Sequence, residues 1–557
     1  MSALLCAAVA GVFFSNAAFS QSTAPSTVEP GQIEKSFEPK IKPATSPDEV
    51  VKPIQEPDSG ADNEVKFKLN SVTISGNTVL SDEELAGVYS RYIGQSVSFR
   101  DLNAIANDVT EKYKQSGYVL ARAFIPPQKV SGGTVEIKVI EGFIDQISIQ
   151  GQIEGDRSLL DAYVEKIKAV KPLRTSTLER YMLLMDDLPG VTARGLLRPS
   201  KQTIGAADLI ISISHDKTEV DLEANNRGTR YLGPYQLSAT VRANSWNDRY
   251  ERTTVRYVTT SQTNELKFFD ASYSEPVGTD GATVSGSFVR SKSKPGSNIK
   301  SLDLDSDNNS VGLEYVYPVI RSREENFFTR VNATMRQTVT DSVGARLTKD
   351  DVRVARVGAQ YDKVDSFEGV NLADLELSQG LDVFNATDNN AGASRTSADA
   401  DFTKAVLNLS RYQPFMEKFA VLVSATGQYA SGSLFASEEM GLGGSGFGSA
   451  YDPSEITGDH GAAGKAELQY SKYAGQEYLS SYQLYSFFDG GVVWNDNAAS
   501  GESKRATLTS AGVGTRLYFN DTVSGQLELA VPLTRDVASE GAQGDNPRMF
   551  FSLAKRF

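Results

Sequence analysis

Residues 235–244 read YQLSATVRAN, in which every odd position is apolar or aromatic and every even position is polar. Residues 327–336, FFTRVNATMR, continue the same pattern apart from Phe328 and Thr329. A period of two residues places the two sets of side chains on opposite faces of a β-strand. Stretches of this kind recur from residue 217 to residue 557. We expect about sixteen strands there, each long enough to cross a bilayer at the usual tilt.

The connections between these strands differ in length on the two sides of the predicted sheet. Long connections follow alternate strands, and most of the others are short, for example at 412–417 and 519–522. This one-sided arrangement is typical of a transmembrane β-barrel, although two connections, near 227–234 and 261–263, are short on the long side. A soluble β-sandwich with long loops is the alternative. The long connections span 292–309, 381–402, 431–462, 494–506 and 533–547.

The last strand ends at a terminal aromatic residue, Phe557, with Met549, Phe551 and Leu553 on the same face. A terminal aromatic on an alternating strand is common in outer-membrane barrels. Lys555 interrupts the alternation here. The ending therefore favours a membrane barrel without deciding it.

The composition excludes most catalytic and metal-binding classes. Among 557 residues there are one cysteine, Cys6, and two histidines, His215 and His460, with a net charge of −14. Disulfide frameworks, structural zinc sites and thiol catalysis need more of these residues. The mean hydropathy of −0.31 and the lack of an apolar run of 18 residues argue against a membrane-spanning helix. They do not argue against a membrane barrel, because the apolar residues of a barrel strand occupy only alternate positions.

Two motifs that resemble enzyme signatures lack their structural context. The glycines of 441–446 match a dinucleotide fingerprint, but no βαβ unit surrounds them and Pro453 interrupts any following helix. Asp459 and His460 could be half of a nucleophilic triad, yet the chain has no G-x-S-x-G elbow. We therefore expect no catalytic residue, no cofactor, no metal ion and no enzyme activity.

The N-terminal 64 residues separate into two parts. Residues 1–20 contain an apolar run at 3–14 followed by small residues, as in a signal peptide, although no basic residue precedes the run. Residues 21–64 hold seven of the 20 prolines, a density that favours an extended linker.

Two small α+β modules precede the predicted barrel. Residues 65–141 show the order β-α-α-β-β, with strands at 67–74, 118–125 and 134–140 and helices at 81–92 and 101–115. Residues 142–216 repeat this order about 75 residues later, with strands at 144–150, 191–198 and 207–215 and helices at 158–170 and 177–188. Capping pairs Ser81 with Glu84 and Ser176 with Glu179 are predicted to open one helix in each module.

Several segments in order carry a family resemblance. They are GNTVLSDEEL (76–85), the stretch SGYVLARAFIPPQKVSGGTVEIKVIEGFI (116–144), TLERYMLLMDDLPGV (177–191), YSEPVG (273–278), LGGSGFGSAYDPSEITGDHG (442–461) and FFDGG (487–491). Together they closely resemble the two-partner secretion transporters of Gram-negative bacteria, of the ShlB/FhaC type. The resemblance implies two tandem periplasmic POTRA domains, 65–141 and 142–216, followed by a transmembrane barrel at 217–557 in the outer membrane.

The resemblance also implies a function and partners. Such a pore recognises one large exoprotein, an adhesin or haemolysin-like β-helical protein, in the periplasm and passes it to the surface without nucleotide hydrolysis. We expect contacts with outer-membrane lipids and lipopolysaccharide, insertion by the barrel-assembly machinery, and no nucleic-acid partner. An outer-membrane protein insertion factor of the same superfamily and a general diffusion porin are the alternatives.

In the family, the loop that here spans 431–462 turns back into the barrel, where an arginine pairs with a carboxylate in a wall motif F-x-D-x-G. Asp489 supplies the carboxylate of this motif and Gly491 its glycine, but Ser449 occupies the arginine position. Either Asp489 has another cation such as Arg516, or the loop is looser, or its role has drifted. We expect the loop still to fold inward, through Gly443, Gly444, Phe447, Ser449, Tyr451, Gly458, Asp459 and Gly461.

Two further expectations follow from the resemblance. The first module offers a groove between its second helix and the following strand that could capture an extended chain by β-augmentation. We assign to it Leu102, Tyr113, Val119, Ala121 and Phe124. The family often carries an N-terminal helix that plugs the pore, and residues 31–37, GQIEKSF, are the short candidate, of at most two turns.

Overall fold

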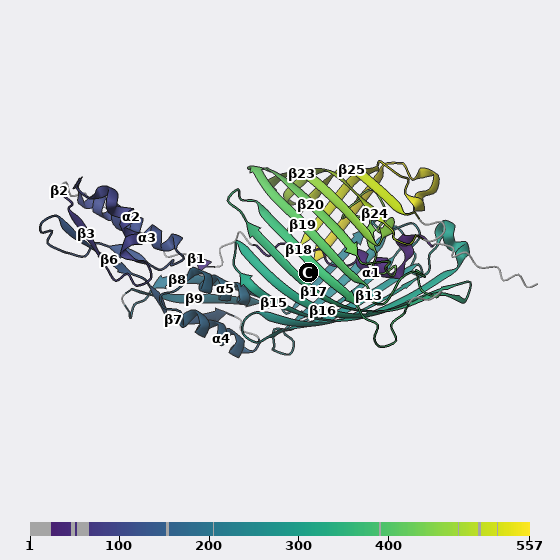
Figure 1. Cartoon of the computed structure of the whole chain (residues 1–557), viewed down its shortest axis with the longest axis horizontal. Coiled ribbons are helices and arrows are strands. Elements are labelled where there is room, and N and C mark those ends of the chain that lie inside the picture. Colours follow the sequence, from purple (N-terminus) through teal and green to yellow (C-terminus); the bar gives the residue numbers. More distant parts are fainter. Residues whose placement is uncertain are drawn as a thin grey trace, which may run out of the picture.

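The computed structural model describes residues 24–45, 51–52, 66–151, 155–203, 205–388, 392–476, 478–498, 503–520 and 522–557. The proposed signal peptide lies outside the described residues. Two α/β modules extend from one end of a tilted-strand barrel, and a short helix, α1, lies within the outline of the barrel away from the modules (Figure 1). No helix among the described residues is long and apolar enough to cross a membrane.

The barrel contains sixteen antiparallel strands in chain order, which confirms the predicted architecture. It closes where the first strand pairs with the last, with Asp221 opposite Arg556 and Asn225 opposite Ser552. The strands are β10 Thr218–Asn225, β11 Gln236–Asn244, β12 Arg252–Thr260, β13 Leu266–Val277, β14 Ala282–Ser293, β15 Leu304–Arg321, β16 Glu325–Ser342, β17 Ala345–Val364, β18 Val370–Gly380, β19 Thr403–Met416, β20 Phe419–Ala430, β23 His460–Gln476, β24 Leu479–Trp494, β25 Arg505–Tyr518, β26 Val523–Pro532 and β27 Arg548–Arg556.

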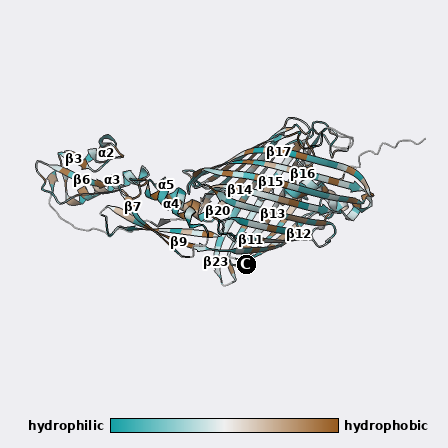
Figure 2. Cartoon of the chain, turned by 90° about the horizontal axis from the view of Figure 1, so that it is seen from below, coloured by the Kyte–Doolittle hydropathy of each residue, from teal (hydrophilic) through white to brown (hydrophobic). Residues whose placement is uncertain are grey.

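The alternation along the strands separates an apolar outer face from a polar lumen. Leu237 is 57% exposed and Val331 is 54% exposed, whereas Arg336 on the other face of β16 is 5% exposed. Brown and teal positions alternate along the strands in Figure 2. An apolar outer band with polar residues inside is the arrangement that a lipid-embedded barrel requires.

The long connections lie at the end of the barrel away from the modules, but two connections at that end are short. One of them joins β12 to β13 through residues 261–265. Strands β16 and β17, of 18 and 20 residues, are joined there by a turn of only two residues, Val343 and Gly344. The predicted loop 292–309 is shorter than expected, because β15 already begins at Leu304.

The two modules share one topology. The first contains β3 Ser71–Ser75, α2 Asp82–Tyr89, α3 Phe99–Gln115, β5 Arg122–Phe124 and β6 Thr134–Ile140, with short strands β2 Phe67–Lys68 and β4 Ser96–Val97 paired separately. The second contains β7 Phe143–Gly151, α4 Arg157–Lys168, α5 Thr175–Asp186, β8 Val191–Pro199 and β9 Ala206–His215. In each, the first strand is parallel and the second antiparallel to the last, which lies between them.

The helix starts in the two modules differ from one another. Helix α2 begins with the predicted capping box of Ser81 and Glu84. Helix α5 begins at Thr175 after Arg174, without a side-chain cap, so the predicted Ser176–Glu179 cap is wrong. Its first residue is instead held by the neighbouring module, because the Thr175 N–H donates to the carbonyl of Gly117 at 2.8 Å.

The interpretation of 21–64 as an extended linker is wrong for residues 24–45. These residues lie inside the barrel and include the 3₁₀ turn η1, Ser26–Val28, and helix α1, Pro30–Ser36. Val28 and Ile33 are 3% and 4% exposed, because they pack on apolar side chains of the barrel interior that include Leu266. Residues further on form β1, Val51–Lys52, which adds a parallel strand beside β8.

The second module is joined to the periplasmic mouth of the barrel by charged contacts. The Lys166 ammonium lies 2.6 Å from the Asp280 carboxylate in the β13–β14 turn. Arg321, at the end of β15, forms an ion pair with Asp187 at 2.8 Å and also donates to the carbonyl of Ala44. One guanidinium therefore links the module, the wall and the N-terminal segment.

The first module depends on a buried carboxylate. Glu141 accepts hydrogen bonds from the Val79 N–H at 2.9 Å and the Tyr113 hydroxyl at 3.0 Å, and also from Thr78. Burial alone would raise the pKa of the Glu141 carboxyl, but the hydrogen bonds from Thr78, Val79 and Tyr113 hold this pKa below its ordinary value of 4.5. The ionised form therefore stabilises the fold.

We expect Glu141→Gln to destabilise the first module at pH 7 by about 1–3 kcal/mol, because buried donors lose a charged acceptor. The contribution is complete above pH 4.5 and is lost as pH falls through the lowered folded-state pKa. Hydrogen exchange of α2 and α3 in the full-length protein between pH 3 and 7 measures it. Glu111→Gln, at an exposed glutamate of α3, is the control; equal protection in the two variants at pH 7 would contradict the assignment.

Candidate functional site

The loop between β20 and β23 folds into the barrel. It forms a small hairpin of β21, Met440–Leu442, and β22, Ile456–Gly458. Its side chains join wall residues of β24, β25 and β26 in one apolar cluster, in which Tyr451 is 1% exposed and Leu508 is fully buried. The loop therefore lies packed against one side of the lumen.

Asp489 on β24 is the wall residue that the loop tip contacts. The backbone N–H of Ser449 donates to the Asp489 carboxylate at 3.0 Å, and the Ser449 hydroxyl donates at 2.5 Å. The hydroxyl of Ser510 on β25 donates to the other carboxylate oxygen. Ser449, Ser510 and Asp489 are all 0% exposed. The structure thus brings together the two positions that the family resemblance pairs.

A lysine that the sequence reasoning missed completes this cluster. The Lys465 ammonium donates to the Ser449 hydroxyl at 3.0 Å and lies 3.8 Å from the Asp489 carboxylate. Arg516, considered as the cation for Asp489, is wrong in that role. Its guanidinium pairs instead with Glu467 at 2.6 Å and with Gln483.

Glycines permit the close contact between loop and wall. Gly443 has φ +128°, and a Cβ there would lie 2.0 Å from the Asp452 carbonyl oxygen. On the wall, a Cβ at Gly491 would lie 2.6 Å from the side chain of Leu442. A larger residue at position 443 would therefore disturb the fold of the loop itself, and one at position 491 would push the loop away from the wall. Gly444, Gly458 and Gly461 lie in the same loop and at the start of β23; Phe447 is half-buried.

Asp459 holds the base of the loop rather than its tip. Its carboxylate accepts from the Leu434 N–H at 2.7 Å and from the Asp496 N–H at 3.0 Å, and pairs with Arg395. Asp459 is 0% exposed. Three surface loops are therefore tied together at this carboxylate.

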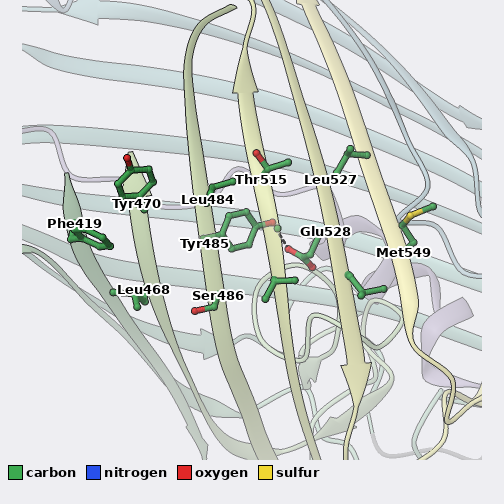
Figure 3. A pocket seen from close by; sticks show the side chains of 13 residues that line it. Phe419, Leu468, Tyr470, Leu484, Tyr485, Ser486, Thr515, Leu527, Glu528 and Met549 are labelled. Carbon is green, nitrogen blue, oxygen red and sulfur yellow. Dashed lines mark hydrogen bonds between the residues drawn. The ribbon is translucent and has the colours of Figure 1, made fainter. Parts of the chain in front are cut away.

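Two arginines near the ends of the sheet hold the loop by its backbone. Arg227 donates to the Ser449 carbonyl at 2.9 Å, and Arg548 donates to the Ala450 carbonyl at 2.8 Å. Arg227 also pairs with Glu528 at 2.6 Å, and Glu528 in turn accepts from the Tyr485 hydroxyl at 2.7 Å (Figure 3). Wall and loop form one hydrogen-bonded network.

Helix α1 rests directly on the inward loop. The Gln32 side chain donates to the Ala436 carbonyl at 2.7 Å and accepts from the Ser454 hydroxyl at 2.9 Å. A Cβ at Gly31 would lie 2.3 Å from the Cβ of Ser437, so the helix approaches the loop backbone at its glycine.

One wall arginine contacts both inserted elements. Arg336 on β16 lies 3.1 Å from Glu34 of α1 and 3.0 Å from Glu438 of the loop. Glu438 also pairs with Lys404 at 2.6 Å and with Arg356 at 3.0 Å. Glu34, Arg336 and Glu438 are all buried. Charge balance inside the lumen therefore requires both the helix and the loop.

The groove assignment in the first module needs correction. Leu102, Tyr113 and Ala121 are 3%, 0% and 3% exposed, because they point into the module core. They cannot contact a partner in this state, so their assignment to the groove is wrong. Val119, which precedes the edge strand β5, and Phe124, the last residue of β5, are half-buried.

The residues that sequence reasoning missed share one property. Lys465, Arg227, Arg336, Glu34 and Glu438 are charged residues from segments distant in sequence that meet only in the lumen. For Lys465 and Arg336 the signal in the sequence was a charged residue on the polar face of a predicted strand, which many residues of a barrel share. Arg227, Glu34 and Glu438 lie outside the barrel strands and carried no such signal. Only Lys465 could have been found, since it lies one strand away from the FFDGG motif.

Comparison with known proteins agrees with this architecture. The family model described as haemolysin secretion/activation protein ShlB/FhaC/HecB matches residues 205–517, and that of the ShlB-type POTRA domain matches residues 67–142. The heme/hemopexin transporter protein HuxB of Haemophilus influenzae is 26% identical over 516 residues, which cover 89% of this chain and 88% of HuxB. The outer membrane transporter CdiB of Dickeya dadantii is 25% identical over 82% of this chain and 81% of its own.

Solved structures show the same fold. CdiB from Escherichia coli superimposes with a TM-score of 0.69 at 20% identity, covering 90% of this chain and 93% of that chain. BamA from Haemophilus ducreyi, lacking POTRA domains 1–3, gives a TM-score of 0.51 at 14% identity, over 88% of this chain and 100% of that chain. Because the family model covers more than half of the residues, the chain belongs to the ShlB/FhaC/HecB family of haemolysin secretion/activation proteins, with its barrel in the outer membrane and its POTRA region in the periplasm.

Proposed function

We propose that this chain is the outer-membrane pore of a two-partner secretion system, which takes one large exoprotein from the periplasm and passes it to the surface. The observation that carries the proposal is a sixteen-stranded barrel joined to α/β modules and filled by two inserted elements, α1 and the inward loop. A general diffusion porin has no use for such modules.

The N-terminal segment supports a closed resting pore. From α1 near the long loops it runs along the lumen to the periplasmic mouth. The Phe37 carbonyl accepts from Arg256 at 2.9 Å on the way, and the Thr45 N–H donates to Asp362 at 3.1 Å near the mouth. These contacts use the backbone of the segment. A chain in transit must displace this segment or share the lumen with it.

Capture of the partner is assigned to the free sheet edge of the first module. Strand β5 pairs with β6 on one side only; Val119 precedes this strand and Phe124 is its last residue. An extended segment could add there by β-augmentation, with the two side chains as contacts. The equivalent edge of the second module, β8, is already covered by β1.

Lipids are the expected partners of the outer face. A shallow apolar hollow crosses strands β20 to β27, lined by side chains that include Leu468, Leu484, Leu527 and Met549 (Figure 3). Acyl chains of the outer membrane fit its chemistry. Lipopolysaccharide contacts and insertion by the barrel-assembly machinery are further parts of the proposal.

Deletion of the gene tests the proposed function. We expect one large protein to disappear from the cell surface and the medium, while other outer-membrane proteins keep their levels, because the pore is partner-specific. Quantitative proteomics of the two fractions measures this. A general fall of outer-membrane proteins would indicate an insertion factor instead, and an unchanged survey would contradict secretion.

Substitution of Arg336 tests the closure. We expect Arg336→Gln to raise the frequency of channel openings in planar bilayers, because loss of a buried partner costs about 3–5 kcal/mol and frees both α1 and the loop. Arg330→Gln is the matched control, since Arg330 is also inward-facing on β16 but pairs with wall residues Asp374 and Glu376. Equal opening frequencies in the two variants would contradict a special role of Arg336.

A further inference from the structure

The Asp489 carboxylate poses an electrostatic problem at the centre of the site. Its side chain is 0% exposed. A buried carboxylate needs hydrogen-bond donors and, unless it is neutralised, a nearby positive charge, because transfer of a lone charge out of water is costly. The source of that positive charge decides what happens when the loop leaves.

The loop tip brings no charge to Asp489. Residues 447–451 are Phe, Gly, Ser, Ala and Tyr, and the contacts to Asp489 come from the Ser449 N–H and hydroxyl. The third donor, the Ser510 hydroxyl, belongs to the wall. All three donors are neutral.

The nearest cation comes from the wall. Lys465 and Asp489 are directly opposite each other on β23 and β24. The Lys465 side chain is 15% exposed, and its ammonium lies 4.5 Å from the centre of the Phe487 ring. It donates to the Ser449 hydroxyl, which itself donates to Asp489. The serine hydroxyl is therefore inserted between the two charged groups of a cross-strand pair.

We propose that Lys465 is the positioning counter-ion of Asp489, so that the barrel wall supplies the charge of this contact and the loop supplies only neutral donors. Lys465 acts on the loop through Ser449 and Asp489. The inference deepens the proposed function by naming how the inward loop is held. It rests on that function only in treating release of the loop as a step in opening the pore.

The arrangement has a consequence for loop release. Because Lys465 and Asp489 are strand partners, they remain neighbours when the loop departs, and the 3.8 Å separation can close into a direct ion pair. An arginine at position 449 would instead have to be pulled away from its carboxylate. The wall pair thus lets the loop leave without separating opposite charges.

Loop release can be measured without a secreted partner. Ala530 on β26 is 0% exposed and belongs to the apolar cluster of loop and wall. In full-length protein with Cys6→Ser and Ala530→Cys, reconstituted in liposomes, the rate of maleimide labelling reports how often the loop leaves the wall. Secretion is recorded separately, so failure of the proposed function and failure of this inference are distinguishable.

We expect Lys465→Met to raise the labelling rate at least about tenfold, because the buried carboxylate loses its counter-ion in the held state. Lys465→Arg should keep the parental rate. Lys363→Met is the matched control, since Lys363 pairs with Glu325 directly across two strands, β16 and β17, but touches no inserted loop. It should label at the parental rate.

Two double variants distinguish the loss of a charge from the loss of side-chain packing in Lys465→Met. Asp489→Asn removes the unpaired charge, and Ser449→Arg returns a cation from the loop; each, added to Lys465→Met, should bring the labelling rate back towards that of the parent. A loss of side-chain packing alone would not be corrected by either. A parental rate in Lys465→Met, or the absence of any recovery in both double variants, would overturn the assignment.

Discussion

Closure of the barrel between β10 and β27 is the constraint on which the remaining structure depends. In a bilayer every backbone N–H and C=O must find a partner within the protein, and a closed antiparallel sheet satisfies all of them without a free edge. The pairing of residues 221–225 with residues 552–556 completes the ring. Once the ring is closed, polar side chains face a lumen wide enough to need filling.

The lumen is filled by two inserted elements and not by the wall. The inward loop covers one side through neutral contacts at Asp489, and α1 lies on the loop. Both elements are also held by charge, since Arg336 pairs with Glu34 and with Glu438. Buried ion pairs of this kind contribute little net stability, but removal of one partner is costly. The closed state is therefore specific and reversible, as a transport pore requires.

The positions of the counter-ions explain how a neutral residue can stand at the loop tip. Ser449 needs no charge, because Lys465 lies on the strand next to Asp489 and Arg227 holds the loop carbonyl from another part of the sheet. In this chain, charges on the wall and beside it stand where the family resemblance implies a charge at the loop tip.

Local features of the sequence predict about sixteen strands with alternating faces, the side of the long loops and two repeated modules, and the family resemblance implies the pairing of position 449 with Asp489. These follow from local periods and from motifs that specify one strand or one loop. The short helix candidate at 31–37 coincides with α1, Pro30–Ser36. The prediction of an extended linker was wrong for residues 24–45, because proline content describes the free chain, whereas burial of Val28 and Ile33 inside the barrel stabilises a packed structure there. Sequence reasoning likewise placed Leu102, Tyr113 and Ala121 in a groove, because a helical face does not reveal whether a sheet covers it. Lys465, Arg336 and Glu438 were decided only by the tertiary structure, since barrel closure brings charges from distant strands together and burial makes their pairing obligatory.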